Sequence, residues 1–192
     1  GVQSRNRNLN KNQDMLGFYE FVNERKDFFK YIDYILRKTF QIKKKDILRF
    51  TGEWVGPGVQ SRVGLSDIKD RLWILFDISI YERDESNTTN NDIIEDEPSK
   101  HLQMAHDIIR KMQLPSKNIY IVTNFLSFKL TVDLNDIQTA VDKAMRLTDA
   151  VAQNCPVSAQ LGIKGFGEGI VWVTDETILP FGETYRLLAK TK

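Results

Sequence analysis

The sequence predicts an α+β domain with antiparallel sheets, and three observations carry that prediction. Apolar residues recur at helical spacing over residues 15–40 and 134–153. Residues 72–81 alternate in the manner of a β-strand. Shorter strand-like runs occur at 47–55, 118–132 and 184–192.

Composition and charge restrict the classes of protein to which this chain can belong. The 192 residues are enough for one domain with a buried core, and 41% hydrophobic and 28% charged residues are ordinary for a soluble globular protein. The formal net charge is +1, so the chain as a whole does not attract nucleic acid, and any basic surface must be local. No apolar run reaches the length of a membrane span and no signal peptide is present, so we expect no membrane partner.

The single cysteine and the two ends of the sequence carry further expectations. Cys155 has no second cysteine with which to form an intrachain disulfide, and it suits a reducing compartment. We therefore expect a cytoplasmic protein. The sequence begins at Gly1 rather than at methionine, and Lys192 ends it inside a predicted strand. We expect a domain that is truncated at both ends.

The first predicted helix covers residues 15–40 and carries an aromatic stripe. Such a stripe predicts a helix that packs on the core rather than a cofactor site. Its apolar members are Phe18, Phe21, Val22, Phe28, Phe29, Ile32, Ile35 and Leu36. Residues 37–49 hold six basic residues against one acid, Asp46. This segment is either a surface for nucleic-acid phosphates or a solvated charged turn.

Residues 47–55 predict a strand that leads into Gly56-Pro57-Gly58. Glycine lets the backbone approach a ligand closely, and proline limits how far the turn can move. Glu53 enters this turn beside an indole. The segment Thr51–Arg62 is therefore either the wall of a small-molecule site or a hairpin corner with an incidental acid.

Residues 72–81 predict the strongest strand of the chain. Regular alternation places one set of side chains on one face, namely Leu72, Ile74, Phe76, Ile78 and Ile80. The other face then holds Trp73, Leu75, Asp77, Ser79 and Tyr81. Asp77 is unusual, because a carboxylate in a strand buried on both faces is costly unless it is paired. It is either half of a structural salt bridge or a functional residue.

The middle of the chain offers no metal site. Residues 82–98 contain seven acids and predict an acidic flexible insertion. A short amphipathic helix is expected at 100–112. His101 and His106 lie five positions apart in it, so they do not share a helix face as a pair of zinc ligands would. We expect both histidines to be structural or exposed.

The last third of the chain brings charged residues to glycines and to a strand. The helix at 134–153 has an apolar stripe made of Ile137, Val141, Ala144, Met145, Leu147, Thr148 and Val151. Four glycines then lead into a strand within residues 161–173, with Glu168 at its mouth. They do not form a dinucleotide-binding loop, because such a loop opens a helix and this one opens a strand. In the final strand, Lys190 and Lys192 are expected to share one face, where they meet an anion or form a frayed, exposed end.

Five segments in a fixed order connect these features over nearly the whole chain. They are Ser4-Arg5-Asn6, Gly52-Glu53-Trp54-Val55-Gly56-Pro57-Gly58-Val59-Gln60, Trp73-Ile74-Leu75-Phe76-Asp77-Ile78, Glu168-Gly169-Ile170-Val171-Trp172 and Lys190-Thr191-Lys192. The set resembles the ATP-dependent RNA ligases of the covalent nucleotidyltransferase superfamily. The likeness is strongest to the phage RNA ligase 2-like branch, which includes RNA-editing and RNA-repair ligases. The second and fourth segments are its specific parts.

The resemblance implies a fold, a reaction and its cofactors. The fold would be a nucleotidyltransferase or ATP-grasp-like ligase domain, in which antiparallel sheets flank a nucleotide-binding cleft, and residues 1–192 would form part of one adenylyltransferase domain. In such ligases a lysine attacks the α-phosphate of ATP and forms a lysyl-AMP. The AMP passes to an RNA 5′-phosphate, and a 3′-hydroxyl then displaces it and seals the strand. The reaction uses Mg²⁺ or Mn²⁺.

The resemblance also implies a role for each matching residue. Arg5 would contact the nucleotide or the RNA phosphate, and Glu53 would accept hydrogen bonds from the ribose hydroxyls. Phe76 would stack on adenine, and Asp77 would support the site from behind, because pleating puts these neighbours on opposite faces unless a bulge intervenes. Finally, Glu168 would bind the divalent metal, and the lysines of the last segment, Lys190 and Lys192, would contact the AMP phosphate.

Two departures from the family pattern leave alternatives open. The family's nucleophile lies in a Lys-x-x-Gly element upstream of Ser4-Arg5-Asn6, and no such element precedes Arg5 in this sequence. Several members also carry a lysine where this chain has Val173. The alternatives are a DNA ligase, a capping-type nucleotidyltransferase, and a noncatalytic nucleotide- or nucleic-acid-binding module of the same fold. The expected partners are RNA ends or nicked RNA, with a C-terminal domain or a separate partner adding RNA affinity.

Overall fold

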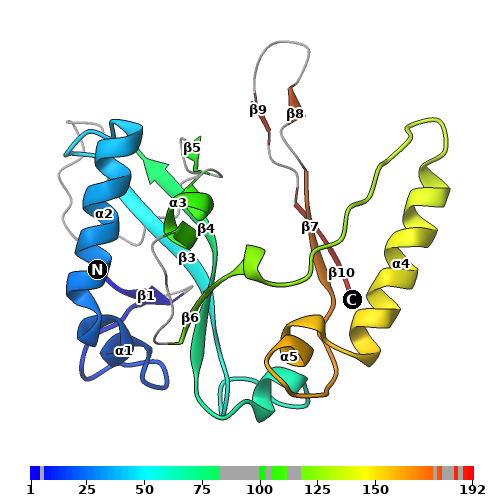
Figure 1. Ribbon diagram of the computed structural model, residues 1–192, viewed down its shortest axis with the longest axis horizontal. Coiled ribbons are helices and arrows are strands. Elements are labelled where there is room, and N and C mark those ends of the chain that lie inside the picture. The colour runs from blue at the N-terminus through cyan, green and yellow to red at the C-terminus, as the bar shows by residue number, and fades with distance from the viewer. Residues whose placement is uncertain are drawn as a thin grey trace. The chain divides into compact units, whose positions relative to one another are not determined.

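A computed structural model describes most of the chain as two compact units. The described residues are 1–4, 7–82, 100–102, 105–111, 118–174, 177–178, 184–185 and 188–192. Unit 1 comprises residues 1–55 and 71–124, and unit 2 comprises residues 56–70 and 125–192. Figure 1 shows the elements of each unit, which are taken separately below. The acidic insertion predicted at 82–98 lies outside the described residues, except for Glu82.

Unit 1 begins with two helices where the sequence predicts one. A two-stranded ladder of β1 (Gln3–Ser4) and β2 (Arg7–Asn8) precedes α1 (Phe18–Glu24) and α2 (Lys26–Phe40). Arg25 separates the helices, because its φ of −105° and ψ of 17° depart from helical values. The guanidinium of Arg25 donates to the carbonyl of Phe21 at 2.9 Å, in the last turn of α1.

A mixed sheet forms the centre of unit 1. Strand β4 (Leu72–Tyr81) pairs antiparallel with β3 (Ile47–Val55) and with β5 (Lys100–His101). It also pairs with β6 (Ile119–Ile121), and that pairing is parallel. The predicted α+β class and the bounds of β3 and β4 are therefore confirmed. The predicted antiparallel pairing holds for β3 and β5, whereas β6 adds a parallel pairing that was not predicted.

The aromatic stripe of the first helical region packs on this sheet. The ring of Phe18 lies 5.3 Å from that of Trp54 and 5.9 Å from that of Trp73, measured between centroids. The ring centroid of Phe21 lies 4.8 Å from that of Trp54, and the ring centroid of Phe29 lies 5.8 Å from that of Trp73. Figure 1 shows α1 and α2 on the same side of β3. The stripe belongs to the core, as the helical spacing predicts.

Two predictions for the end of unit 1 are partly wrong. Residues 100–112 contain β5 and a shorter helix, α3 (Ala105–Lys111), in place of one continuous helix. The strands expected at 118–132 are reduced to β6, a 3-10 turn η2 (Val122–Asn124) and irregular chain. The Asn124 side chain accepts from the amide of Ile121 at 2.9 Å, which closes the chain into a turn directly after β6.

The described residues of unit 2 combine helices with short strands. Its elements are η1 (Gly64–Asp67), α4 (Ile137–Gln153), α5 (Pro156–Gln160), β7 (Ile170–Val173), β8 (Thr177–Ile178), β9 (Thr184–Tyr185) and β10 (Leu188–Thr191). β7 pairs antiparallel with β10, and β8 with β9. The predicted long helix is confirmed as α4, whereas α5 was not predicted. Among the described residues, no helix has both the length and the apolar character needed to cross a bilayer.

The N-terminus of α4 makes the stability of this helix depend on pH. The Asp136 carboxylate accepts from the hydroxyl of Thr139 at 2.7 Å and from its amide at 3.2 Å, and these bonds hold the pKa of Asp136 below its usual value. A lowered carboxyl pKa stabilises the fold above the unfolded-state pKa, and this contribution is lost as pH falls through the folded-state pKa.

We expect Asp136→Asn to retain the cap but to lose this pH dependence, because asparagine caps helices without titrating. Thermal unfolding followed between neutral and acidic pH measures the difference from the wild type. Equal pH profiles for the two proteins would contradict the assignment.

Candidate functional site

The first cluster of candidate site residues is built on a β-bulge in unit 1. Along the β3–β4 ladder Gly52 pairs with Leu75, but the next residue, Thr51, pairs with Asp77. Phe76 is thus an extra residue on β4 with no partner opposite. Such a bulge shifts the alternation of side chains by one position and bends the strand.

The bulge changes which residues of β4 share a face. Directly paired residues project to the same side of a sheet, so Asp77 lies on the side of Thr51, and Glu53 lies two residues further along the same side. The regular alternation predicted for residues 72–81 is therefore wrong beyond Leu75. Trp73 and Leu75 now share a face with Ile78 and Ile80, and that face carries the indole that packs on α1 and α2.

The face opposite the helices brings three predicted site residues together. Glu53 is exposed, Asp77 is half-buried, and Phe76 is 39% exposed although its neighbours Leu75 and Ile78 are buried. Glu53 and Asp77 are diagonal neighbours across the ladder, a relation that places Cα atoms about 7–8 Å apart. Regular pleating would place Phe76 and Asp77 on opposite faces, but the bulge interrupts the alternation, so Asp77 lies on the side of Glu53.

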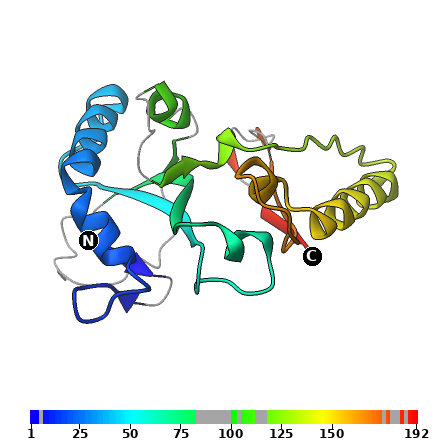
Figure 2. The same ribbon diagram turned by 60° about the horizontal axis from the view of Figure 1, so that its bottom comes forward.

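The Gly-Pro-Gly segment forms a type II turn at the start of unit 2. The amide of Val59 donates to the carbonyl of Gly56 at 3.0 Å, with Pro57 and Gly58 as the central residues. Gly58 has a φ of 79°, which a type II turn requires at that position and which favours glycine. Gln60 accepts from the amide of Gly56 at 3.0 Å and holds the turn from its far side. Figure 2 shows the turn and η1 brought forward.

A second cluster of candidate site residues lies at the paired strands of unit 2. β10 pairs with β7 so that Lys190 is opposite Val171 and Thr191 is opposite Ile170. Glu168, Lys190 and Lys192 are all exposed. β10 ends at Thr191, so only Lys190 of the two lysines lies within the strand.

Gly169 brings the segment of Glu168 against the end of β10. Its φ is 137°, and a Cβ added there would collide with the carbonyl oxygen of Thr191 and lie 3.2 Å from the Cα of Lys192. The backbone beside Glu168 therefore touches the backbone between Thr191 and Lys192. This close approach places the carboxylate of Glu168 and the two lysines on adjoining segments, an arrangement in which a phosphate could meet both a metal ion and cations.

Hydrogen bonds from α4 and β7 fix the end of β10. The Thr148 hydroxyl on α4 is 2.5 Å from that of Thr191 and donates to the carbonyl of Ala144 at 2.8 Å. The Trp172 indole donates to the Thr191 hydroxyl at 2.9 Å. Thr148 is only 1% exposed. The sequence places it in the apolar stripe of α4, where its hydroxyl was not recognised as a contact to β10. A hydroxyl on the buried side of an amphipathic helix was the sequence signal that could have predicted this hydrogen bond.

The predicted site residues divide between the two units. Glu53, Phe76 and Asp77 belong to unit 1, whereas Glu168, Lys190 and Lys192 belong to unit 2. Arg5 lies outside the described residues. Within the described part of the chain, no three acidic, histidine or cysteine side chains gather as a metal site. An exposed carboxylate such as Glu168 still suits Mg²⁺, because this ion keeps several waters and takes other ligands from substrate phosphates.

A Lys-x-x-Gly pattern within the chain is explained by packing rather than by a functional site. Lys164 is followed by Gly165-Phe166-Gly167 and so matches the bare Lys-x-x-Gly pattern. A Cβ at Gly165 would lie 2.8 Å from the amide nitrogen of Gly64, and one at Gly167 would lie 2.6 Å from the Val151 carbonyl oxygen. Tight packing therefore accounts for both glycines.

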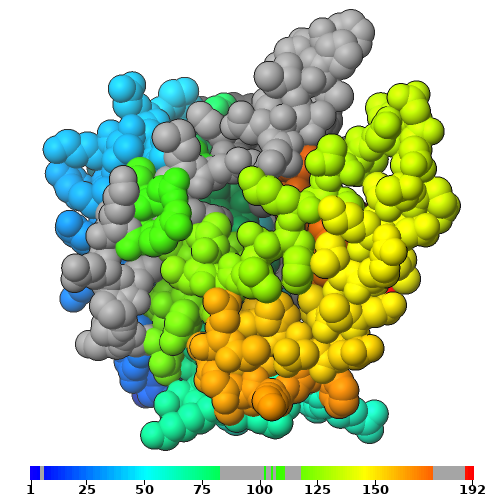
Figure 3. All heavy atoms as spheres, turned by 45° about the vertical axis from the view of Figure 1, so that its right-hand side comes forward, coloured from blue at the N-terminus to red at the C-terminus, as the bar shows by residue number. Residues whose placement is uncertain are grey.

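A cavity of about 450 Å³ lies beside α4 and α5, which Figure 3 shows in yellow and orange. It is lined by Leu126, Phe128, Ala150, Val151, Asn154, Pro156, Ala159 and Gln160. None of the predicted site residues lines it, and it presents no charged group.

Comparison with known proteins identifies no relative. No protein-family model matches the chain, and no curated protein or solved structure matches it either. The case for a function therefore depends on the residues described above.

Proposed function

We propose that the chain is the adenylyltransferase domain of an ATP-dependent RNA ligase. It would bind ATP, pass AMP through a lysine to an RNA 5′-phosphate, and support sealing to a 3′-hydroxyl. The motivation is the order of the five sequence segments and the chemistry of the side chains that they place on the two units. RNA ends or nicked RNA are the proposed substrates, in a role such as RNA repair.

The bulge at Phe76 is the observation that carries the proposal. Without it, Asp77 would project towards α1 and α2, away from Glu53. With it, one face of unit 1 offers an exposed carboxylate, a second carboxylate and a partly exposed aromatic ring. Bulges recur beside active sites because they redirect a side chain in this way.

These three groups match the needs of a nucleoside. A carboxylate such as Glu53 accepts hydrogen bonds from the two ribose hydroxyls, because an ionised carboxylate has only acceptors. The Phe76 ring offers a flat apolar face to a purine. In this proposal Asp77 is a second acceptor on the same face, not a residue that acts from behind the sheet.

The groups of unit 2 match the needs of a phosphate. Phosphoryl-type transfer depends mainly on positioning and on neutralising charge at the phosphate. Lys190 and Lys192 supply cations next to the Glu168 segment, and Gly169 lets these segments touch. Bound Mg²⁺ would supply further charge neutralisation at the phosphate, and Glu168 is the residue proposed to hold it.

The proposal can be tested through the nucleophile, which the resemblance places in a Lys-x-x-Gly element upstream of Ser4-Arg5-Asn6. We expect the 192-residue chain to bind ATP without covalent labelling, and a version preceded by a Lys-x-x-Gly element, if one is encoded upstream, to form a lysyl-AMP. ATP with a label on the α-phosphate, supplied with Mg²⁺ or Mn²⁺, measures both. Labelling of the 192-residue chain at Lys164 would overturn the expectation that the nucleophile lies upstream, and absence of ATP binding would overturn the proposed function.

The same assay separates the remaining alternatives. Preferential labelling from GTP would favour a capping-type nucleotidyltransferase. Sealing of nicked DNA in preference to nicked RNA would indicate a DNA ligase. Nucleotide binding without labelling in any extended version would indicate a noncatalytic module.

A further inference from the structure

The outer face of α2 and the loop that follows it carry exposed aromatic and basic side chains. Tyr31 and Tyr34 are 56% and 60% exposed, and they lie three residues apart on the helix. Lys38 follows Tyr34 at a spacing of four residues and is exposed as well. Residues at these spacings are neighbours on a helix surface, so the three side chains form one stripe.

The loop after α2 carries further exposed lysines. Lys43 and Lys44 are exposed in the turn that joins α2 to β3. The acid of this loop, Asp46, is only 7% exposed, so its carboxylate is not part of the exposed surface. Tyr31, Tyr34, Lys38, Lys43 and Lys44 are hereafter called the Tyr-Lys surface.

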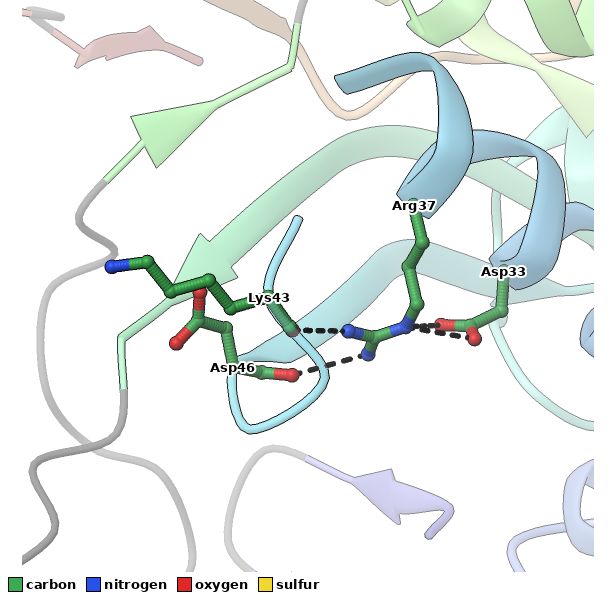
Figure 4. Close-up of polar contacts among 4 residues, drawn as sticks. All are labelled: Asp33, Arg37, Lys43 and Asp46. Carbon is green, nitrogen blue, oxygen red and sulfur yellow. Dashed lines mark hydrogen bonds and ion pairs between the residues drawn. The ribbon is translucent and has the colours of Figure 1, made fainter. Parts of the chain in front are cut away.

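Arg37 holds this loop in a defined conformation, as Figure 4 shows. Its guanidinium donates to the carbonyl of Lys43 at 2.9 Å and to that of Asp46 at 3.1 Å. Its Nε contacts both carboxylate oxygens of Asp33, at 3.0 and 2.9 Å. Arg37 is therefore occupied within the protein, while the ammonium of Lys43 extends beyond the carboxylate of Asp46. The loop presents its lysines on an ordered backbone.

We infer that the Tyr-Lys surface binds a single-stranded segment of RNA. Proteins that bind single strands combine cations that follow the phosphates with aromatic rings on which bases stack. Both kinds of group occur here on one helix face and the adjoining loop, and the excess of positive charge complements a polyphosphate. The inference rests on the proposed function for the choice of RNA as the partner, and it adds a contact surface that the nucleotide site does not include.

The experiment measures the affinity of the 192-residue chain for a fluorescent oligouridylate of about 12 nucleotides, a length within the usual range of single-strand sites. Four double variants are compared with the wild type. Lys43→Gln with Lys44→Gln removes two cations, and Tyr31→Ala with Tyr34→Ala removes the rings. Tyr31→Phe with Tyr34→Phe retains the rings. Lys129→Gln with Lys143→Gln removes two exposed lysines elsewhere and is the charge-matched control.

The expected results differ between the lysine and tyrosine variants. Neutralising Lys43 and Lys44 lowers the slope of log affinity against log salt by about 1.4, because each contact with a single-strand phosphate contributes about 0.7. Removing both rings weakens binding by about 10-fold or more at constant salt slope, since stacking is not ionic. The phenylalanine variant and the control retain affinity close to that of the wild type.

Three results with the oligonucleotide would overturn the inference. They are no binding of the oligonucleotide by the wild type, an unchanged salt slope in the Lys43 and Lys44 variant, and an equal loss in the control. Dependence on the lysines alone, with polyglutamate bound equally well, would also overturn it and would indicate a surface for an acidic protein. ATP affinity is measured for every variant and should not change. Loss of the proposed function would appear as absence of ATP binding, which leaves the RNA result to be judged separately.

Discussion

Substitution of Gly169 by alanine is expected to disrupt the pairing of β7 with β10 and to abolish ATP binding. A Cβ at this position would collide with the Thr191 carbonyl oxygen and lie 3.2 Å from the Cα of Lys192, both of which are backbone atoms. The φ of 137° adds strain for any residue with a side chain. Together these effects should cost about 3 kcal/mol or more of the free energy of unfolding of unit 2. Amide hydrogen exchange on the two strands measures the loss locally.

Gly162→Ala is the matched control for this prediction. Gly162 also has a left-handed backbone, with a φ of 82°, but a Cβ there meets no heavy atom within 4 Å. The control therefore isolates the conformational cost, about 1–2 kcal/mol for an ordinary residue in this region. If the two substitutions destabilise unit 2 equally, contact with β10 is not the reason for glycine at position 169.

Replacement of Lys190 by methionine is expected to weaken ATP binding by about 10- to 100-fold, the effect of losing a hydrogen bond to a charged group. Methionine retains an apolar stem beside Val171, which is opposite Lys190 in the ladder. Because the lysine is proposed to contact the phosphate, affinity for adenosine should remain unchanged. Calorimetric titration with ATP and with adenosine separates these two effects.

Lys143→Met provides the comparison for the loss of one positive charge. Lys143 is exposed on α4 in the same unit. We expect this variant to bind both ligands as the wild type does. An equal decrease in adenosine and ATP affinity for Lys190→Met would show that the substitution disturbs the fold rather than a phosphate contact.

Local periodicity was sufficient to locate the principal strands and the long helix. β3, β4 and β7 fall where the alternation or the end of the glycine run predicts them, and α4 falls within its predicted range. The aromatic stripe of residues 15–40 likewise predicted a helical region packed on the core. It did not predict the break at Arg25, because that residue is a good helix former and its backbone angles are not apparent from spacing.

The candidate site was likewise predicted only in part from the sequence. Glu53, Phe76, Asp77, Glu168, Lys190 and Lys192 were selected from the sequence by residue type and segment order. The face on which Asp77 lies could not be selected in this way, because a bulge exists only relative to the partner strand. The hydroxyl pair of Thr148 and Thr191 joins residues 43 positions apart, and the parallel pairing of β6 with β4 is equally nonlocal.

The sequence alone therefore determined the α+β class, the principal strands and helices, and the chemical character of the candidate site. Each of these follows from the spacing or identity of residues that are close in the chain. The tertiary structure decided that Asp77 faces the side of Glu53, that Gly169 brings Glu168 against the end of β10, and that Arg37 orders the lysine loop. Each of these depends on contacts between separate segments, whose register, hydrogen bonds and close packing are not encoded in any single stretch of the sequence.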